Sequence, residues 1–267
     1  MQTDTLEVLR GDDILLEDGG PYYCETNLDH VFPEPLNALS AMVFMFISLY
    51  WYFKISRQTQ TFRFLKLASI ILAIGGLGGS IYHGFRFFSW AMWMDWFPIL
   101  ILCIAAASYF IYRIYKSIFW AIAALLFAVF LQFINFTAVP DWLNTSTSYG
   151  ILALFILVPL SIALLKTKFL YGSYPAIALL AFMLALTFRL LDPHADDLIG
   201  FCTHFLWHSF GAVACHAMFM YLFKFKRSFP KFELVNRMKI RNIKIANVKK
   251  AREIILKRWK NNGKGTS

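Results

Sequence analysis

The sequence predicts an all-α membrane protein, a bundle of seven transmembrane helices, and three observations support this fold class. The 267-residue chain is 58% hydrophobic and only 16% charged, which lies outside the usual composition of soluble proteins. Seven apolar segments approach the length of about 20 residues that a helix needs to cross a bilayer. None of them alternates between polar and apolar residues, so we expect helices and not the strands of a membrane barrel.

The predicted spans begin after an acidic segment and end before a basic one. Residues 1–35 contain nine acids and one base, Arg10, and are too polar for a cleaved signal peptide. The transmembrane domain occupies residues 36–223, and a basic tail follows at 224–267. The seven spans lie at 36–54, 64–84, 90–112, 118–136, 149–165, 174–191 and 198–223. The fifth is the weakest, with 17 residues that include Pro159, but its length still suffices.

Charge placement predicts the orientation of the bundle. Lysines and arginines follow the first, third and fifth spans, whereas the connections 137–148 and 192–197 carry four aspartates and no lysine or arginine. By the positive-inside rule, the N-terminus is outside or lumenal and the C-terminus is cytoplasmic. Arg86 and Arg189 lie near outer helix ends, where we interpret them as side chains that snorkel to the surface. A bacterial inner membrane and an endoplasmic reticulum or Golgi membrane both satisfy this topology.

The basic tail predicts a contact with lipids. Residues 224–267 contain ten lysines and five arginines against Glu233 and Glu253, with apolar residues interleaved. This pattern favours a helix on an anionic cytoplasmic leaflet, so anionic lipid headgroups are the expected partners. Nucleic acid is the other common partner of a basic segment, and we set it aside because the chain shows no nucleic-acid-binding motif.

Four ionisable side chains interrupt the apolar spans at one predicted depth. His83 lies near the outer end of the second span and Asp95 near the outer end of the third. His204 and His208 share a helix face and would lie roughly 9–15 Å below the outer end of the last span, at 1.5 Å per residue. An aspartate in hydrocarbon costs about 2.5–3.5 kcal/mol and is rarely kept without a function. The common depth therefore predicts a single site.

The residue types of this cluster favour a catalytic zinc ion. Three histidines leave a fourth coordination position open, and zinc lowers the pKa of bound water towards 7. Asp95 would act as the general base, and Ser80 would hydrogen-bond the water or the oxyanion. Iron would accept similar ligands. In the alternative interpretation, the histidines pack and hydrogen-bond at helix contacts, which is how we interpret His216.

A second polar cluster precedes the first span. Glu25, Asn27, Asp29 and Glu34 lie within ten residues and offer oxygen ligands suited to Ca²⁺. The alternative is an ordinary acidic loop before a helix that begins at Pro35, because proline is common in a first helical turn.

Two polar residues of the first span and the four cysteines of the chain each allow more than one interpretation. Asn37 and Ser40 could cap the first span or line a pocket. The four cysteines show no metal-binding spacing, although a disulfide between Cys24 and Cys202 is possible.

Three stretches of the chain resemble the alkaline ceramidase family, part of a superfamily of seven-helix membrane hydrolases that includes the adiponectin receptors. They are CETN…EPLNALS (24–40), GGSIYHGFRFFSWAMWMDWFPIL (78–100) and HFLWHSFGAVACHA (204–217). The resemblance implies that the three histidines bind zinc, with Asp95 and a serine beside the metal water. It also implies a calcium site formed by Glu25, Asn27, Glu34 and the main-chain oxygen of Tyr23.

Three positions depart from the family pattern. Gly79 stands where the family has a serine four residues before its first histidine, so Ser80 would have to substitute for that serine. Tyr22 stands where the family usually has a calcium-binding aspartate, and Trp96 stands where the family has a glutamate directly after the aspartate that corresponds to Asp95. These departures suggest a divergent member and loosen the assignment of the substrate.

The expected function is that of a zinc-dependent amidase within the membrane. Its substrate would be ceramide or a related sphingolipid, whose N-acyl bond is cleaved to a sphingoid base and a fatty acid. One alternative is a phospholipase-like hydrolase that cleaves esters with the same metal. Another is a seven-helix receptor or transporter in which the histidines form a proton relay or a ligand site.

Overall fold

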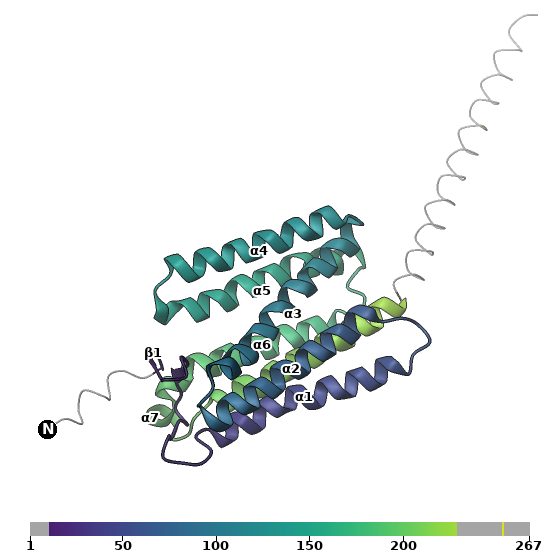
Figure 1. Cartoon of the computed structure of the whole chain (residues 1–267). Helices are drawn as coiled ribbons and strands as arrows, with labels where there is room; N and C mark the ends of the chain where they lie inside the picture. Colours follow the sequence, from purple (N-terminus) through teal and green to yellow (C-terminus); the bar gives the residue numbers. More distant parts are fainter. Residues whose placement is uncertain (1–10, 229–252, 254–267) are drawn as a thin grey trace, which may run out of the picture. The chain divides into compact units, whose positions relative to one another are not determined.

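The computed structural model describes residues 11–228 and residue 253, and within this part of the chain it confirms the predicted all-α class. Seven helices are long and apolar enough to cross a membrane (Figure 1). They are α1 (Pro35–Ser56), α2 (Arg63–Phe85), α3 (Ser89–Tyr115), α4 (Ile118–Ala138), α5 (Asp141–Lys166), α6 (Ser173–Leu191) and the seventh span (His204–Ser228). The predictions for residues 1–10 and for most of the basic tail, including its contact with anionic lipids, lie outside the described residues.

Close packing of α2 against its two neighbours organises the part of the bundle that carries the site. A Cβ added to Gly76 would lie 2.7 Å from the main-chain nitrogen of Met45 on α1. A Cβ added to Gly78 would lie 2.3 Å from the Cβ of Met94 on α3. Small residues allow membrane helices to approach in this way. These glycines therefore bring α1 and α3 close to opposite sides of α2.

The last span begins later than the sequence predicts. After α6 come a short 3₁₀ turn (Asp192–His194) and the helix α7 (Ala195–Ile199), which ends at Gly200 with a φ of 76°. The seventh span then begins at His204 and not at residue 198. His208 is thus one turn from the helix start, about 6 Å at 1.5 Å per residue. The two histidines are closer to the start of the span than predicted, because Leu198 and Ile199 belong to α7 and residues 200–203 are not helical.

The described residues that precede α1, 11–34, form a segment that we call the N-terminal cap. It begins with two short antiparallel strands, β1 (Gly11–Leu15) and β2 (Pro21–Tyr22). Figure 1 shows β1 and α7 at the same end of the bundle. A disulfide between Cys24 and Cys202 joins the cap to the loop before the seventh span. The bond that the sequence left as one possibility is therefore formed.

The contacts of the chain divide it into two units, Met1–Phe223 and Lys224–Ser267. The bundle residues that form the candidate site, and the N-terminal cap, all belong to the first unit.

Candidate metal centre

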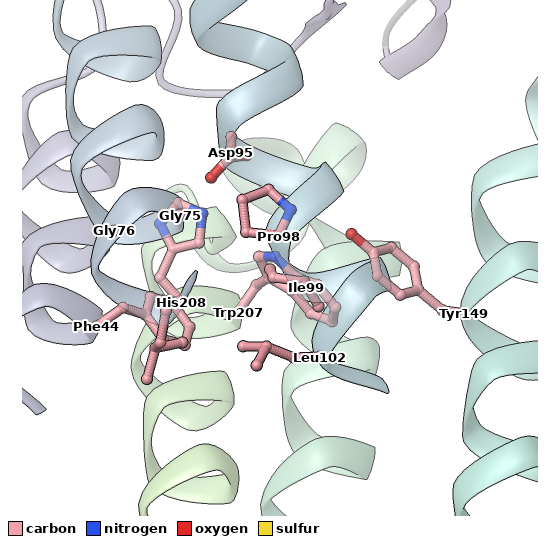
Figure 2. A pocket seen from close by; sticks show the side chains of 11 residues that line it. Phe44, Gly75, Gly76, Asp95, Pro98, Ile99, Leu102, Tyr149, Trp207 and His208 are labelled. Atoms are coloured by element: carbon pink, nitrogen blue, oxygen red, sulfur yellow. The ribbon is translucent and has the colours of Figure 1, made fainter. Parts of the chain in front are cut away.

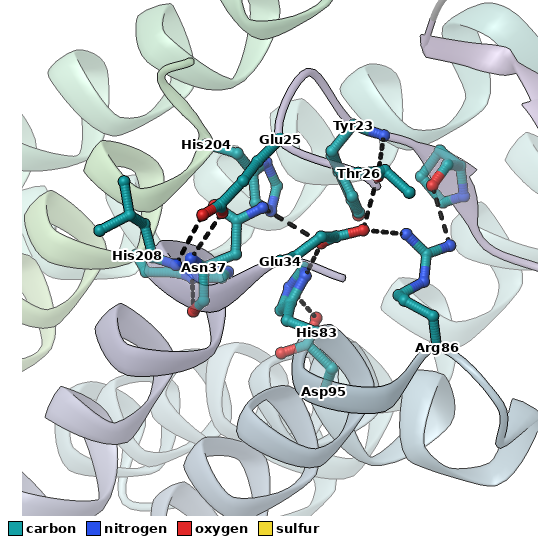
Figure 3. A network of polar contacts seen from close by, with 12 residues as sticks. Tyr23, Glu25, Thr26, Glu34, Asn37, His83, Arg86, Asp95, His204 and His208 are labelled. Atoms are coloured by element: carbon teal, nitrogen blue, oxygen red, sulfur yellow. Dashed lines mark hydrogen bonds and ion pairs between the residues drawn. The ribbon is translucent and has the colours of Figure 1, made fainter. Parts of the chain in front are cut away.

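Three of the predicted residues meet at the end of the bundle that carries the N-terminal cap. His83 lies in the last turn of α2, and His204 and His208 lie in the first two turns of the seventh span. All three side chains are buried, and one nitrogen atom from each lies within 4.8 Å of the other two (Figure 3). The three histidines thus form a group that could bind a metal ion.

Two nitrogen atoms of this cluster lack hydrogen bonds. Nε2 of His83 and Nδ1 of His204 are buried and have no hydrogen-bond partner among the described residues. A buried polar atom without a partner costs about 1–3 kcal/mol, and Trp51, Tyr82 and Ser108 each contain one as well. Two such atoms within one histidine cluster fit coordination of a metal ion, which neutral imidazole nitrogens favour.

Asp95 approaches the histidines from α3. Its Oδ2 lies 4.0 Å from Nε2 of His83, and its side chain is 24% exposed. Gly79 makes room for it, because a Cβ at that position would lie 2.3 Å from Oδ1 of Asp95. The structure therefore places glycine, and not the serine of the family pattern, against this carboxylate. The hydroxyl of Ser80, the predicted second catalytic residue, donates to the main-chain oxygen of Gly76 in its own helix, at 2.7 Å.

Two of the histidines are oriented by neighbours that bind their other ring nitrogen. Nδ1 of His83 lies 2.5 Å from Oε2 of Glu34. Nδ1 of His208 lies 2.9 Å from the hydroxyl of Ser40 and 3.1 Å from the main-chain oxygen of Asn37. An imidazole that donates from Nδ1 keeps Nε2 available as a ligand. The sequence marked Ser40 and Asn37 as possible pocket residues but did not connect them with His208.

Glu34 is the most densely bonded acid of the site. The Thr26 hydroxyl and the Arg86 guanidinium donate to Oε1, and the Asn37 amide donates to Oε2 beside His83. Burial alone would raise the pKa of Glu34, but the contact with His83, the charge of Arg86 and the Thr26 hydrogen bond outweigh it and lower the pKa of this carboxylate. Glu34 is therefore an anion that accepts hydrogen bonds on both oxygens.

Arg86 does not snorkel to the surface as predicted. The residue is only 5% exposed, and its guanidinium pairs with Asp18 and Glu34. A solvated head group was the simplest expectation for an arginine at a helix end. The sequence could not reveal the pairing, because Asp18 lies 68 residues and Glu34 lies 52 residues away along the chain.

Asp192 fixes the start of the seventh span and was not recognised from the sequence. Its buried Oδ1 accepts hydrogen bonds from the main-chain nitrogens of Thr203 and His204, at 2.8 and 2.7 Å. Its Oδ2 accepts the main-chain N–H of Cys24 at 3.1 Å. An aspartate that binds the first main-chain amides of a helix stabilises the helix start. Together with the Cys24–Cys202 disulfide, it holds His204 in place.

The other predicted calcium ligands also have partners within the protein. The Glu25 carboxylate accepts the main-chain N–H groups of Leu36 and Asn37 at the start of α1. The side-chain oxygen of Asn27 and the main-chain oxygen of Tyr23 each accept a nearby main-chain N–H. The Tyr23 ring packs against His204 with a centroid distance of 4.0 Å. Burial raises the pKa of Tyr23, so its phenol stays neutral.

A pocket opens beside the histidines, between α1, α2, α3, α5 and the seventh span. Asp95 and His208 line it together with apolar side chains (Figure 2). These include Phe44, Leu72, Ile99, Leu102 and Trp207. The pocket thus places a carboxylate and a candidate metal ligand against an apolar wall, with a cavity of about 20 Å³ that has room for about one water molecule.

Comparison of the chain with protein-family models, with curated proteins and with solved structures found no match. Its function is therefore argued from the site.

Proposed function

We propose that this protein is a zinc-dependent hydrolase that cleaves an amide bond of a membrane lipid, with ceramide or a related N-acyl sphingolipid as the leading substrate. One observation carries the proposal. Three buried histidines, two of them with an unpaired ring nitrogen, lie beside Asp95 at an apolar pocket between membrane-spanning helices. A lipid with long chains could reach such a site without leaving the bilayer.

His83, His204 and His208 are the residues that would hold the metal. Three imidazole ligands with one open position are typical of catalytic zinc, whereas structural zinc sites use four protein ligands. When bound, zinc supplies Lewis-acid chemistry and lowers the pKa of water to about 7. Glu34 and Ser40 support this assignment, since each contacts Nδ1 of a histidine and leaves Nε2 of that ring for the ion.

Asp95 would carry the proton during hydrolysis. Its carboxylate lies beside the histidine cluster and faces the pocket (Figure 2), so it can reach both a water molecule and the substrate nitrogen. Asp95 accepts a proton from water as the water oxygen forms a bond to the carbonyl carbon. It then donates that proton to the nitrogen as the carbon–nitrogen bond breaks. The products are a fatty acid and a free sphingoid amine.

The remaining residues of the pocket would bind and orient the substrate. Phe44, Leu72, Ile99 and Leu102 offer an apolar surface to a hydrocarbon chain. Trp207 lines the same surface one residue before His208. Ser80 has no part in this proposal, because its hydroxyl hydrogen-bonds the main chain of its own helix.

A lipid panel tests the proposal. The full-length protein, reconstituted in liposomes with zinc, is incubated with a ceramide or with a diacyl phospholipid, and the products are identified by mass spectrometry. Release of a sphingoid base that is lost in His204→Ala supports the amidase. Release of lysophospholipid alone favours the ester-cleaving alternative. Zinc bound at one ion per chain without any product from either lipid would contradict hydrolysis and favour a receptor or transporter.

A further inference from the structure

Arg86 ends α2 in an uncommon conformation and carries its charge into the protein interior. Its φ of 53° lies in the left-handed region, where the residue after a helix is usually glycine. The side chain has no exposed surface, although a buried charge is costly unless it is paired and hydrogen-bonded. The arginine must therefore be kept in place by the groups around its guanidinium.

Two carboxylates and a main-chain carbonyl surround this guanidinium, and Figure 3 shows Arg86 directed towards one of them, Glu34. Nε and Nη2 donate to the two carboxylate oxygens of Asp18, at 2.7 and 3.1 Å. Nη1 donates to Oε1 of Glu34, and Nη2 also donates to the main-chain oxygen of Pro21, at 3.0 Å. The rings of Tyr82 and Tyr23 have their centroids 4.6 and 5.6 Å from the guanidinium carbon, within the range of a cation–π contact.

These oxygens are of the types that bind calcium, but a protein side chain already supplies the cation. Calcium takes six to eight oxygen ligands from carboxylates, carbonyls and water. Glu34, one of the predicted calcium ligands, has both oxygens bonded to protein donors. Tyr22 stands where the family resemblance expects an acid, and its hydroxyl donates to the main-chain oxygen of Thr26. The oxygens of the predicted calcium ligands are therefore already bonded to protein donors and do not form an open site for a calcium ion.

We propose that Arg86 is the resident cation of the N-terminal cap, in place of calcium, and that it positions His83 through Glu34. Glu34 receives the guanidinium on Oε1 and contacts Nδ1 of His83 with Oε2. The guanidinium thus holds the carboxylate that orients the His83 ring, whose Nε2 belongs to the candidate metal centre. Arg86 is a positioning residue, and this role does not depend on which reaction the site performs.

Calcium binding by the unmodified protein gives the first test. The full-length chain is purified in detergent, passed through calcium-stripped buffer and then exposed to millimolar calcium. Elemental analysis is expected to find no bound calcium, and the thermal unfolding midpoint Tm is expected to stay unchanged on addition of calcium. A calcium ion bound at one per chain, with a Tm that rises on its addition, overturns the proposal. This measurement needs no variant.

Removal of the guanidinium gives the second test. Arg86→Met leaves the carboxylates of Asp18 and Glu34 buried without their cation, so the Tm should fall by roughly 10 °C. The His83 ring also loses its fixed partner, so affinity for Co²⁺, followed by its absorption bands, should fall about tenfold. A purely structural role would lower the Tm and leave the cobalt affinity and spectrum of the folded protein unchanged, and that result contradicts the positioning role.

Two further variants keep the second test decisive. Arg63→Met removes an exposed arginine from the other end of α2 and should change neither the Tm nor the cobalt affinity. If Arg86→Met does not fold, Arg86→Lys replaces it, because lysine keeps the charge but loses the forked donors that bind two carboxylates. Its cobalt affinity should lie below that of the unmodified protein. An affinity equal to that of the unmodified protein overturns the proposal.

Discussion

Two clusters of polar side chains lie among the apolar spans, and they differ in how completely their atoms are hydrogen-bonded. The first joins α4 to α5. The Asn135 amide donates to two oxygens of Asn144 and accepts the Thr147 hydroxyl. One turn away, the side chains of Gln132 and Ser148 bind each other, at 2.7 Å between hydroxyl and amide oxygen. Every residue of this cluster has its partner on the facing helix.

The histidine cluster between α2 and the seventh span is different. Glu34 contacts Nδ1 of His83, and Ser40 contacts Nδ1 of His208. Nε2 of His83 and Nδ1 of His204, by contrast, have no hydrogen-bond partner among the described residues. A closed polar network within a membrane stabilises helix association. A cluster with unpaired buried nitrogens calls for a ligand. The comparison teaches that polarity within a span does not by itself indicate a site, whereas two unpaired imidazole nitrogens within one group of three buried histidines do.

The largest expected effect is the loss of metal when a histidine is removed. His83→Ala leaves two imidazoles, one fewer than the three protein ligands of a catalytic zinc site. Bound zinc, measured by elemental analysis of purified protein, should fall from about one ion per chain to near zero, and lipid hydrolysis should be lost with it. Asn135→Leu is the matched control and should keep its zinc. Full zinc content in His83→Ala would contradict the prediction that the histidine cluster, unlike the cluster of α4 and α5, binds the metal ion.

Removal of the carboxylate beside the histidines should separate chemistry from metal binding. Asp95→Asn keeps the size of the side chain and all three histidines, so zinc content should stay unchanged. Loss of a general base typically lowers kcat by about 10²–10⁴-fold. The initial rate of fatty-acid release from reconstituted protein measures this effect. A variant that keeps its zinc and hydrolyses lipid at the normal rate would show that another group moves the proton.

The fold could be predicted from the sequence because a membrane leaves few choices. Apolar segments of sufficient length must form helices, since lipid cannot satisfy free main-chain groups. The start of the last span was predicted wrongly. Residues 198–203 are apolar enough to extend it, but Gly200 ends α7 in a left-handed conformation. Asp192 then caps the new helix at His204.

The site was predictable only in part, for a physical reason. His83, Asp95 and the two later histidines stand out because ionisable groups are rare in spans. The residues that orient them are ordinary in sequence: Glu34 is one of nine acids before α1. Its contact with His83 joins positions 49 residues apart, which spacing within a helix cannot indicate. The sequence offered Ser80 as a substitute for a serine at position 79, and only the close approach of α3 shows that Gly79 meets Asp95.

A smaller loss of metal affinity is expected when a residue that orients one of the histidines is removed. Ser40→Ala removes the hydroxyl that lies 2.9 Å from Nδ1 of His208, while the main-chain oxygen of Asn37 remains as a partner at 3.1 Å. Loss of such a neighbour typically lowers metal affinity 10–100-fold, and we expect about tenfold here because one partner remains. Competition with a zinc-binding dye measures the change. Ser209→Ala is the control, since that hydroxyl binds only the main chain of its own helix, and an equal loss in both variants would argue against orientation of His208.

The smallest effect on the metal centre should come from the closed cluster of α4 and α5. Asn135→Leu removes an amide that is 4% exposed and bonded to Asn144 and Thr147. Interhelical hydrogen bonds in membranes are worth about 1 kcal/mol, so the Tm should fall by only a few degrees. Phe136→Leu, at a side chain 75% exposed, should leave the Tm unchanged. Zinc content should be normal in both variants, because the polar side chains of the α4 and α5 cluster are already hydrogen-bonded to one another and leave no free atom to bind a metal ion.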